Sequence, residues 1–191
     1  MTIIQNTFIG KFKIGDNIHY NLKILKALYS SRIALLEDQK HYLEKPITVI
    51  LVSICEALIY DFIDRSKYFV REGVNGLTDV SLQRLRNSNT WSFEKKIKLF
   101  KELNLLKTTD ITTYTYLENL ANLRNRIHIQ NEHGNFEADE LDAFTVARRV
   151  EAEKMVELLM KKLSVHYPRP AYIITSKHVE DFELPWSCHF N

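Results

Sequence analysis

The run from Ile47 to Ile63 restricts the fold more than any other part of the chain. It is apolar on nearly every side and is interrupted only by Thr48, Ser53, Glu56 and Asp61. Its length is close to the minimum for a membrane span, but the two carboxylates inside it argue against a lipid environment. A helix that is hydrophobic all round is instead typical of the centre of a bundle. We therefore expect a buried core helix with Pro46 in its first turn.

Composition supports a helical, single-domain protein. The chain has 191 residues with only 5 Gly and 4 Pro, and so few breakers favour long helices over many short strands. Further helices are predicted from Asp16 or Asn17 to about 42–45, from Ser92 to about Leu103, from Ile111 to Asn131, and from Glu137 to His166. We expect an all-α, up-and-down bundle of about five helices. Its core covers about residues 16–164, and the arms 1–15 and 168–191 are irregular or paired as short strands.

Charge and cysteine content exclude several classes of function. A net charge of +2 is too small to indicate nucleic-acid binding by itself. Cys55 and Cys188 are too few and too far apart for a disulfide framework or a metal site, and Cys55 is expected in the core. No basic segment followed by an apolar run occurs at the N-terminus. The sequence therefore predicts a reduced, cytoplasmic protein with no metal and no cofactor.

Two basic segments allow two interpretations each. Residues 71–90 form a long connection with a short helical turn, and Arg84 and Arg86 on it suit either a phosphate-contacting lid or a solvated loop. Lys95, Lys96, Lys98 and Lys101 are expected on the outer side of the next helix. Such a face is either simply solvated or the footprint of a polyanion.

The segment 120–129, with the sequence LANLRNRIHI, places polar residues on an apolar helical face. Taken as a helix, it brings Arg124 and His128 into a stripe formed by Leu117, Leu120, Ala121 and Ile127. A guanidinium and an imidazole in such a stripe need partners, because burying them unpaired is costly. Glu56, an acid inside the most apolar helix, is the expected partner of Arg124. The face is therefore either a satisfied structural pair or the wall of a polar cleft.

These residues resemble the HEPN superfamily of all-α domains. The resemblance rests on an apolar helix with an internal Glu, on a segment like residues 92–97 (SFEKKI), and on a helix ending in LRNRIH. It implies a homodimer in which the arginine–histidine motifs of two protomers face one another across a cleft. Many members are metal-independent endoribonucleases of toxin, abortive-infection or phage-defence type, and others bind nucleotides or partner proteins without cleavage.

The resemblance also assigns site residues. The family motif has Arg, a polar residue, and His after four to six intervening positions. Arg124, Asn125 and His128 keep the polar residue but have three positions between Arg and His, whereas Arg126 and His133 have six and lack it. We prefer Arg124, Asn125 and His128 as the catalytic set, with Glu56 in support, because one-turn spacing puts Arg124 and His128 on one helical face. Arg126 and His133 are the alternative set.

The expected chemistry is RNA cleavage by the ribose 2′-OH. A histidine takes and returns the proton, and an arginine stabilises the phosphorane charge, giving a 2′,3′-cyclic phosphate without a metal. The resemblance further implies an antitoxin or nucleotidyltransferase partner. In some members the latter modifies a tyrosine shortly after the histidine. Here the residues after His128 are Ile129, Gln130 and Asn131, with no tyrosine, so that modification is not predicted. A non-catalytic nucleotide-binding or protein-interaction domain is the alternative, and a plain helical scaffold is the third interpretation.

Overall fold

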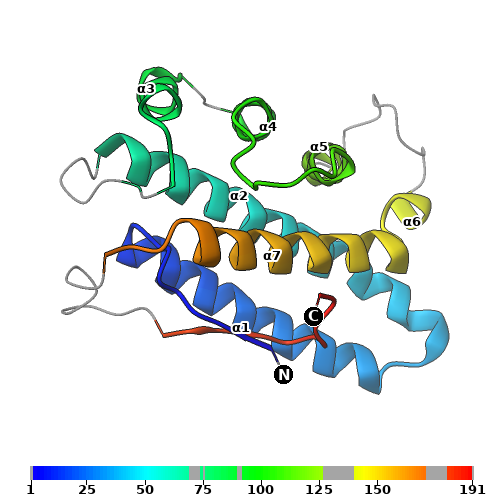
Figure 1. Cartoon of the computed structure of the whole chain (residues 1–191). Helices are drawn as coiled ribbons and strands as arrows, with labels where there is room; N and C mark the ends of the chain where they lie inside the picture. The colour runs from blue at the N-terminus through cyan, green and yellow to red at the C-terminus, as the bar shows by residue number, and fades with distance from the viewer. Residues whose placement is uncertain are drawn as a thin grey trace.

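The computed structural model describes residues 2–68, 74, 76–89, 92–126, 140–170 and 180–190, and in this part the chain is almost entirely helical (Figure 1). The helices are α1 (Phe12–Ala34), α2 (Glu44–Tyr68), α3 (Asp79–Asn87), α4 (Phe93–Glu102), α5 (Thr112–Asn125), α6 (Glu140–Ala143) and α7 (Val146–His166), with a 3-10 helix η1 (Glu37–Leu43) before α2. The strands are β1 (Thr2–Ile4) and β2 (Phe182–Leu184). The all-α prediction is confirmed, and the five predicted helices correspond to α1, α2, α4, α5 and α7.

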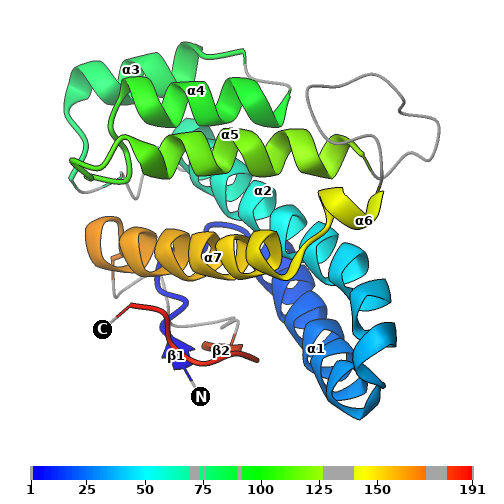
Figure 2. The ribbon, with the colours of Figure 1, turned by 90° about the vertical axis from the view of Figure 1, so that its right-hand side faces the viewer.

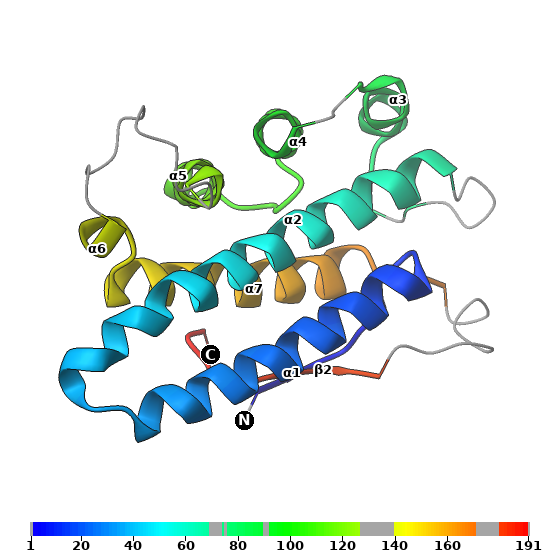
Figure 3. The same cartoon turned by 180° about the vertical axis from the view of Figure 1, so that it is seen from behind.

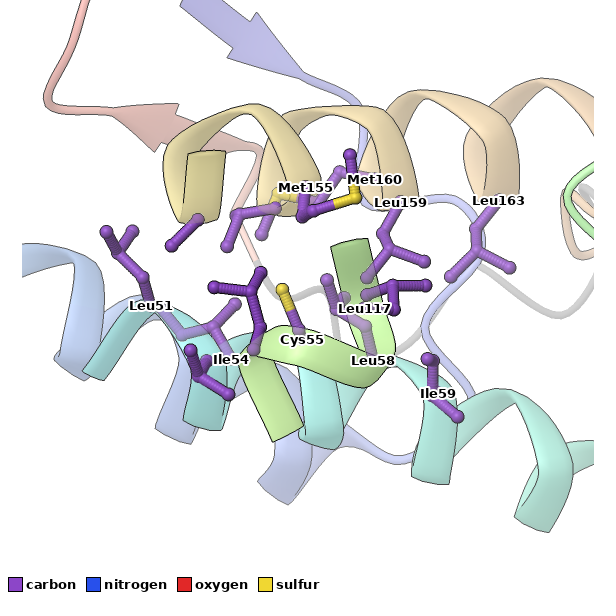
Figure 4. Close-up of a cluster of buried hydrophobic side chains, with 14 of the residues drawn as sticks. Leu51, Ile54, Cys55, Leu58, Ile59, Leu117, Met155, Leu159, Met160 and Leu163 are labelled. Carbon is purple, nitrogen blue, oxygen red and sulfur yellow. The ribbon is translucent and has the colours of Figure 1, made fainter. Parts of the chain in front are cut away.

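Helix α2 is the centre of the fold, as its apolar run predicted. Its side chains Leu51, Cys55 and Leu58 are almost completely buried and pack against Leu159 of α7 and Leu117 of α5 (Figure 4). The segment Glu37–Tyr68 is long and apolar enough to cross a membrane, but most of its apolar window is buried inside the molecule. Burial in a protein core accounts for its hydrophobicity. Pro46 lies in the first turn of α2, where its lack of a backbone N–H costs no hydrogen bond, because N–H groups in the first turn have no partner within the helix.

The other helices pack on two sides of α2. Helices α3, α4 and α5 form a row that is seen nearly end-on in Figure 1, and α1 lies on the opposite side of α2, as the view from behind also shows (Figure 3). Two of these helices begin with capping side chains: Thr78 accepts a hydrogen bond from the N–H of Ser81 at 3.2 Å, and Ser92 accepts one from Lys95 at 3.3 Å. The predicted start of α4 is therefore confirmed.

Helix α1 begins four residues earlier than the capping signal at Asp16 predicted. Asp61 of α2 explains the difference, because its carboxylate accepts the N–H groups of Gly10 (2.6 Å) and Lys11 (2.9 Å) from across the core. A neighbouring helix thus replaces the local cap. The approach is so close that a Cβ on Gly10 would lie 2.9 Å from Cβ of Arg65, which requires a glycine.

Further boundaries differ from the predictions. Helix α1 ends at Ala34 and the 3-10 helix η1 follows it, whereas one helix was expected to run to about residues 42–45. Helix α5 ends at Asn125, where the N–H of Arg126 turns to the carbonyl of Leu123 at 3.1 Å, and the rest of the helix predicted to Asn131 lies outside the described residues. The predicted helix 137–166 is divided into α6 and α7, because buried Phe144 interrupts it and Thr145 caps a new helix by accepting the N–H of Arg148 at 3.3 Å.

The two arms pair with one another beside α7 (Figure 2). β1 and β2 run antiparallel with Thr2 opposite Leu184 and Ile4 opposite Phe182, which confirms the predicted pairing; the apolar run 171–174 lies outside the described residues. The guanidinium of buried Arg65 ties the arms to the bundle. Its Nη1 donates to the carbonyl of Phe8 at 3.2 Å and to that of Tyr167 at 2.7 Å.

Candidate functional site

Glu56 forms a small charged cluster with one cation from each of two neighbouring helices. Its Oε2 lies 3.1 Å from Nη2 of Arg124 on α5, and its Oε1 lies 3.4 Å from Nζ of Lys96 on α4. This confirms the predicted partner of Arg124. The Arg124 side chain is 37% exposed and that of Glu56 is 22% exposed, so the pair opens to solvent. We call Glu56, Lys96 and Arg124 the Glu56 cluster.

Lys96 does not lie on the outer side of α4 as predicted. Its side chain is 9% exposed, whereas its neighbours Lys95 and Lys98 are exposed. The ammonium is 5.1 Å from the ring centroid of Tyr60 on α2, which gives it a cation–π partner besides Glu56. One lysine of this lysine-rich segment, Lys96, therefore points inward, and its positive charge balances the negative charge of Glu56 in the apolar helix α2.

The predicted catalytic residues are only partly within the described structure. Asn125, which follows Arg124 of the Glu56 cluster in the sequence, donates from Nδ2 to Oε1 of Glu94 at 3.2 Å. Arg126 caps α5 and takes part in further contacts within the chain. His128 and His133 lie outside the described residues. Helix α5 ends at Asn125, and the shared helical face of Arg124 and His128 stays a prediction from the sequence.

Two cavities flank Tyr60 next to the Glu56 cluster. The larger, of about 310 Å³, lies between α1 and α2 and is bounded by Glu56 and Lys96; the smaller, of about 230 Å³, includes Asp64 and Lys67. Tyr60 and Lys96 line both. Nζ of Lys11 is 5.8 Å from the Tyr60 ring centroid and 2.5 Å from Asp64. A partly exposed aromatic ring therefore has two ammonium groups close to it.

The arginines of the 71–90 connection are engaged inside the chain. Arg84 forms an ion pair with Glu102 of α4 at 2.5 Å, and Nε of Arg86 donates to the carbonyl of Ser66 at 3.3 Å. These contacts attach α3 to α2 and α4. They suit a structural role for both side chains better than a phosphate-contacting lid.

A second charged network, which the sequence did not predict, joins α1, α2, α7 and the C-terminal segment. Glu44, Arg149 and Glu153 are buried in it, whereas Tyr29, Arg32 and His189 are partly buried. Glu44 accepts from Nε of Arg32 and from Nε of Arg149, both at 2.7 Å. Glu153 pairs with Arg149, accepts from the Tyr29 hydroxyl, and lies 2.9 Å from Nε2 of His189. We call these residues the Glu153 network.

Three of the charged residues of α7 are buried. Arg149, Glu153 and Glu157 recur at four-residue intervals, so they form one stripe on the helix, and all are buried. The four-residue spacing, with opposite charges at 149 and 153, is the signal in the sequence. Burial raises the pKa of the Tyr29 phenol, and the adjacent Glu153 carboxylate adds to the effect.

Glu157 extends the same stripe and holds the C-terminal segment. Its carboxylate accepts the N–H of His189 at 3.0 Å and that of Phe190 at 3.2 Å, and it pairs with Lys161 at 2.9 Å. Burial acts to raise the pKa of Glu157, but these bonds, with one from Cys188, outweigh it and lower the pKa to about 2. The ionised carboxylate is therefore part of the fold.

Comparisons with known proteins add no assignment: the chain matches no family model, and neither curated proteins nor solved structures give a significant match. The HEPN resemblance therefore rests on the sequence motif. Within the part of the chain that the structure describes, no group of three or more His, Cys, Asp or Glu side chains is placed to hold a metal ion.

The two charged sites differ in what they can do chemically. In the Glu153 network Arg149 is buried between the carboxylates of Glu44 and Glu153. In the Glu56 cluster the Arg124 guanidinium reaches solvent and contacts one carboxylate, that of Glu56, which leaves N–H donors for an added anion. A phosphate is a suitable ligand, because the planar guanidinium can contact two of its oxygens at once.

Proposed function

We propose that this chain is a metal-independent endoribonuclease that acts where α5 ends, with Arg124 contacting the scissile phosphate. The observation that carries the proposal is the solvent-open Arg124 guanidinium fixed at 3.1 Å by Glu56. Preorganised positive charge of this kind stabilises the negative charge that accumulates on a phosphate during substitution. Lys96, 3.4 Å from the same carboxylate, adds a second cation.

In the proposed reaction the ribose 2′-OH attacks phosphorus and the bond from phosphorus to the 5′-oxygen breaks. His128, assigned by the family resemblance, takes the 2′-OH proton as neutral imidazole. A protonated imidazole then protonates the leaving 5′-oxygen. The products are a 2′,3′-cyclic phosphate and a 5′-hydroxyl. A homodimer would bring a second Arg124 and His128 to the same cleft, so the acid and the base can come from different protomers.

The test is cleavage of single-stranded RNA in excess EDTA, with the termini of the products identified. We expect cleavage with 2′,3′-cyclic ends, and a decrease of about 10² to 10⁴ in rate for His128→Ala. Arg124→Gln should also lose activity, whereas Arg84→Gln, which alters an arginine paired elsewhere, should not. Full activity of His128→Ala together with loss in His133→Ala would move the site to the alternative pair. No cleavage by the wild-type protein would overturn the proposal.

A binding domain without catalysis is the second candidate, and the ion pair itself favours it. Glu56 already balances one positive charge, so Arg124 and Lys96 together leave about one net charge to retain an anion. Such a domain would bind RNA or a nucleotide tightly without turnover. Retained binding with no product in the same EDTA assay would select this candidate.

A further inference from the structure

The larger cavity beside the Glu56 cluster has the wall chemistry of a site for a flat, uncharged ring. Ile14 and Ile18 of α1 face Ile54 and Ala57 of α2 across it, and most of its surface is apolar. Its volume of about 310 Å³ is at the lower end of the range for small-molecule sites, which is about 300 to 1,000 Å³. Such a space suits one ring system with part of its attached sugar.

Tyr60 provides an aromatic surface on the wall of this cavity. It is 41% exposed, and the ammonium groups of Lys11 and Lys96 lie 5.8 and 5.1 Å from its ring centroid. The lysines hold the ring through cation–π contacts, so stacking on it costs little further side-chain freedom. Aromatic rings presented in this way are the usual stacking partners of unpaired nucleobases.

Polar side chains also line the cavity. Asn17 and Asn21 lie one turn apart on α1, and Nδ2 of Asn21 donates to the carbonyl of Asn17 at 2.8 Å. Carboxamides carry both donors and acceptors, as the edges of nucleobases do. The charged residues on the lining, Glu56 and Lys96, compensate one another, which favours a neutral ring over a second phosphate at this position.

We propose that this cavity receives one nucleobase of a single-stranded RNA whose adjoining phosphate lies at Arg124. Glu56 makes the two subsites continuous, because it lines the cavity and holds the Arg124 guanidinium at 3.1 Å. The phosphate position rests on the proposed function, whereas the base pocket rests on the cavity and on Tyr60. The pocket would make cleavage depend on the nucleotide at one position, and the asparagines would select among the bases.

The test measures binding separately from cleavage. Tetranucleotides of 2′-O-methyl RNA lack the nucleophilic hydroxyl, so the full chain cannot cleave them by the proposed reaction. Fluorescence anisotropy should show that the best of the four homopolymers binds at least tenfold tighter than an otherwise identical tetranucleotide without bases. Stacking of one base on an aromatic side chain accounts for a factor of this size.

Substitutions at the ring locate the effect. Tyr60→Leu should remove the difference between the base-containing and abasic probes, Tyr60→Phe should retain it, and Ala57→Trp should remove it by filling the cavity. Tyr116→Leu is the matched control, because Tyr116 is 42% exposed on α5 and lines neither cavity. Melting curves should show that all four variants are folded. Arg124→Gln should weaken the binding of the base-containing and the abasic probe by the same factor.

The outcomes separate this inference from the proposed function. Equal binding of the two probes, an unchanged preference in Tyr60→Leu, or no binding of either probe overturns the base pocket. Cleavage of unmodified RNA without any base preference in binding overturns the pocket and leaves the nuclease. Base-dependent binding without cleavage leaves the pocket and overturns the nuclease.

Discussion

The Glu56 cluster and the Glu153 network both balance carboxylates inside the fold, but they differ in how far their charged groups are exposed to solvent. Both place carboxylates of long helices inside the fold and neutralise them with cations from neighbouring helices. In the Glu153 network the carboxylates are enclosed: Glu153 is 2% exposed and contacts Arg149, Tyr29 and His189. In the Glu56 cluster the carboxylate is partly exposed and one of its cations faces solvent.

This difference separates a structural charge cluster from a candidate site. A closed network has no unfilled hydrogen-bonding position for a ligand, and removing one member leaves another charge buried without a partner. An open cluster contributes little to stability, because water replaces a lost partner, but it can accept an anion. Substitution of Arg149 and of Arg124 tests this distinction through stability, and the buried carboxylate of Asp61, which lies outside both groups, gives an intermediate reference.

The largest effect is expected for Arg149→Met in the Glu153 network. The substitution leaves Glu44 and Glu153 facing each other with less positive charge between them, and should cost about 3 to 5 kcal/mol of unfolding free energy. Urea denaturation measures it. Lys154→Met is the matched control on the exposed side of α7 and should change stability by less than about 0.5 kcal/mol. Equal effects of the two substitutions would show that the network is not structural.

A smaller effect is expected from Asp61, a buried carboxylate that accepts hydrogen bonds from the backbone N–H groups of Gly10 and Lys11. Burial raises its pKa from 3.8 to about 6, although the bonds from Gly10 and Lys11 and the charge of Arg65 act to lower it, while Asp64 nearby acts to raise it. A raised pKa means that the folded state binds the proton more strongly. The stabilisation is therefore complete below pH 3.8 and is lost as the pH rises through about 6.

Between pH 5 and 7 the Asp61 contribution should fall by roughly 1 kcal/mol. The measurement is the unfolding free energy of the wild-type protein minus that of Asp61→Asn over this range, which cancels the histidines. Glu157 has the opposite sign: its lowered pKa of about 2 means that its stabilisation is lost only as the pH falls below 4.5. A difference between the two proteins that is independent of pH would contradict the assignment to Asp61.

The smallest effect on stability is expected for Arg124→Gln. Its ion pair with Glu56 is partly exposed, so its loss should cost less than about 1 kcal/mol and shift the melting temperature by only a few degrees. Arg84→Gln, which breaks the exposed pair with Glu102, should behave alike in the same thermal scan. A loss as large as that of Arg149→Met would make the Glu56 cluster structural and remove the main support for the proposed function.

The sequence predicted what depends on local pattern. The apolar run at 47–63 and the Ser92 cap follow from hydrophobic periodicity and capping chemistry, and the structure confirms them. The pairing of Glu56 with Arg124 joins distant residues and was predicted from the cost of leaving each charge unpaired on an apolar face. Other contacts between distant residues were not predicted. The start of α1 is set by Asp61, about 50 residues away, and no signal near Asp16 reveals it.

The same reason explains the misplaced charges. In the sequence Lys96 does not differ from its lysine neighbours, and only its contacts with Tyr60 and Glu56 of α2 explain its burial. In the same way, the sequence around Glu153 does not reveal its contact with His189, which lies 36 positions further along the chain. The stripe at 149, 153 and 157 was visible as a pattern, but its burial required partners from other helices. The roles of His128 and His133 remain predictions from the sequence.

The pairing of the two arms has a mechanical consequence. Thr2 lies opposite Leu184, so the chain enters β1 and leaves β2 at the same end of the ladder. A force applied to residues 2 and 184 would load the ladder bonds one after another, and the strands would separate like a zipper instead of sharing the load in shear. The arms would therefore detach at low force, while α2 and α7 would still be packed together.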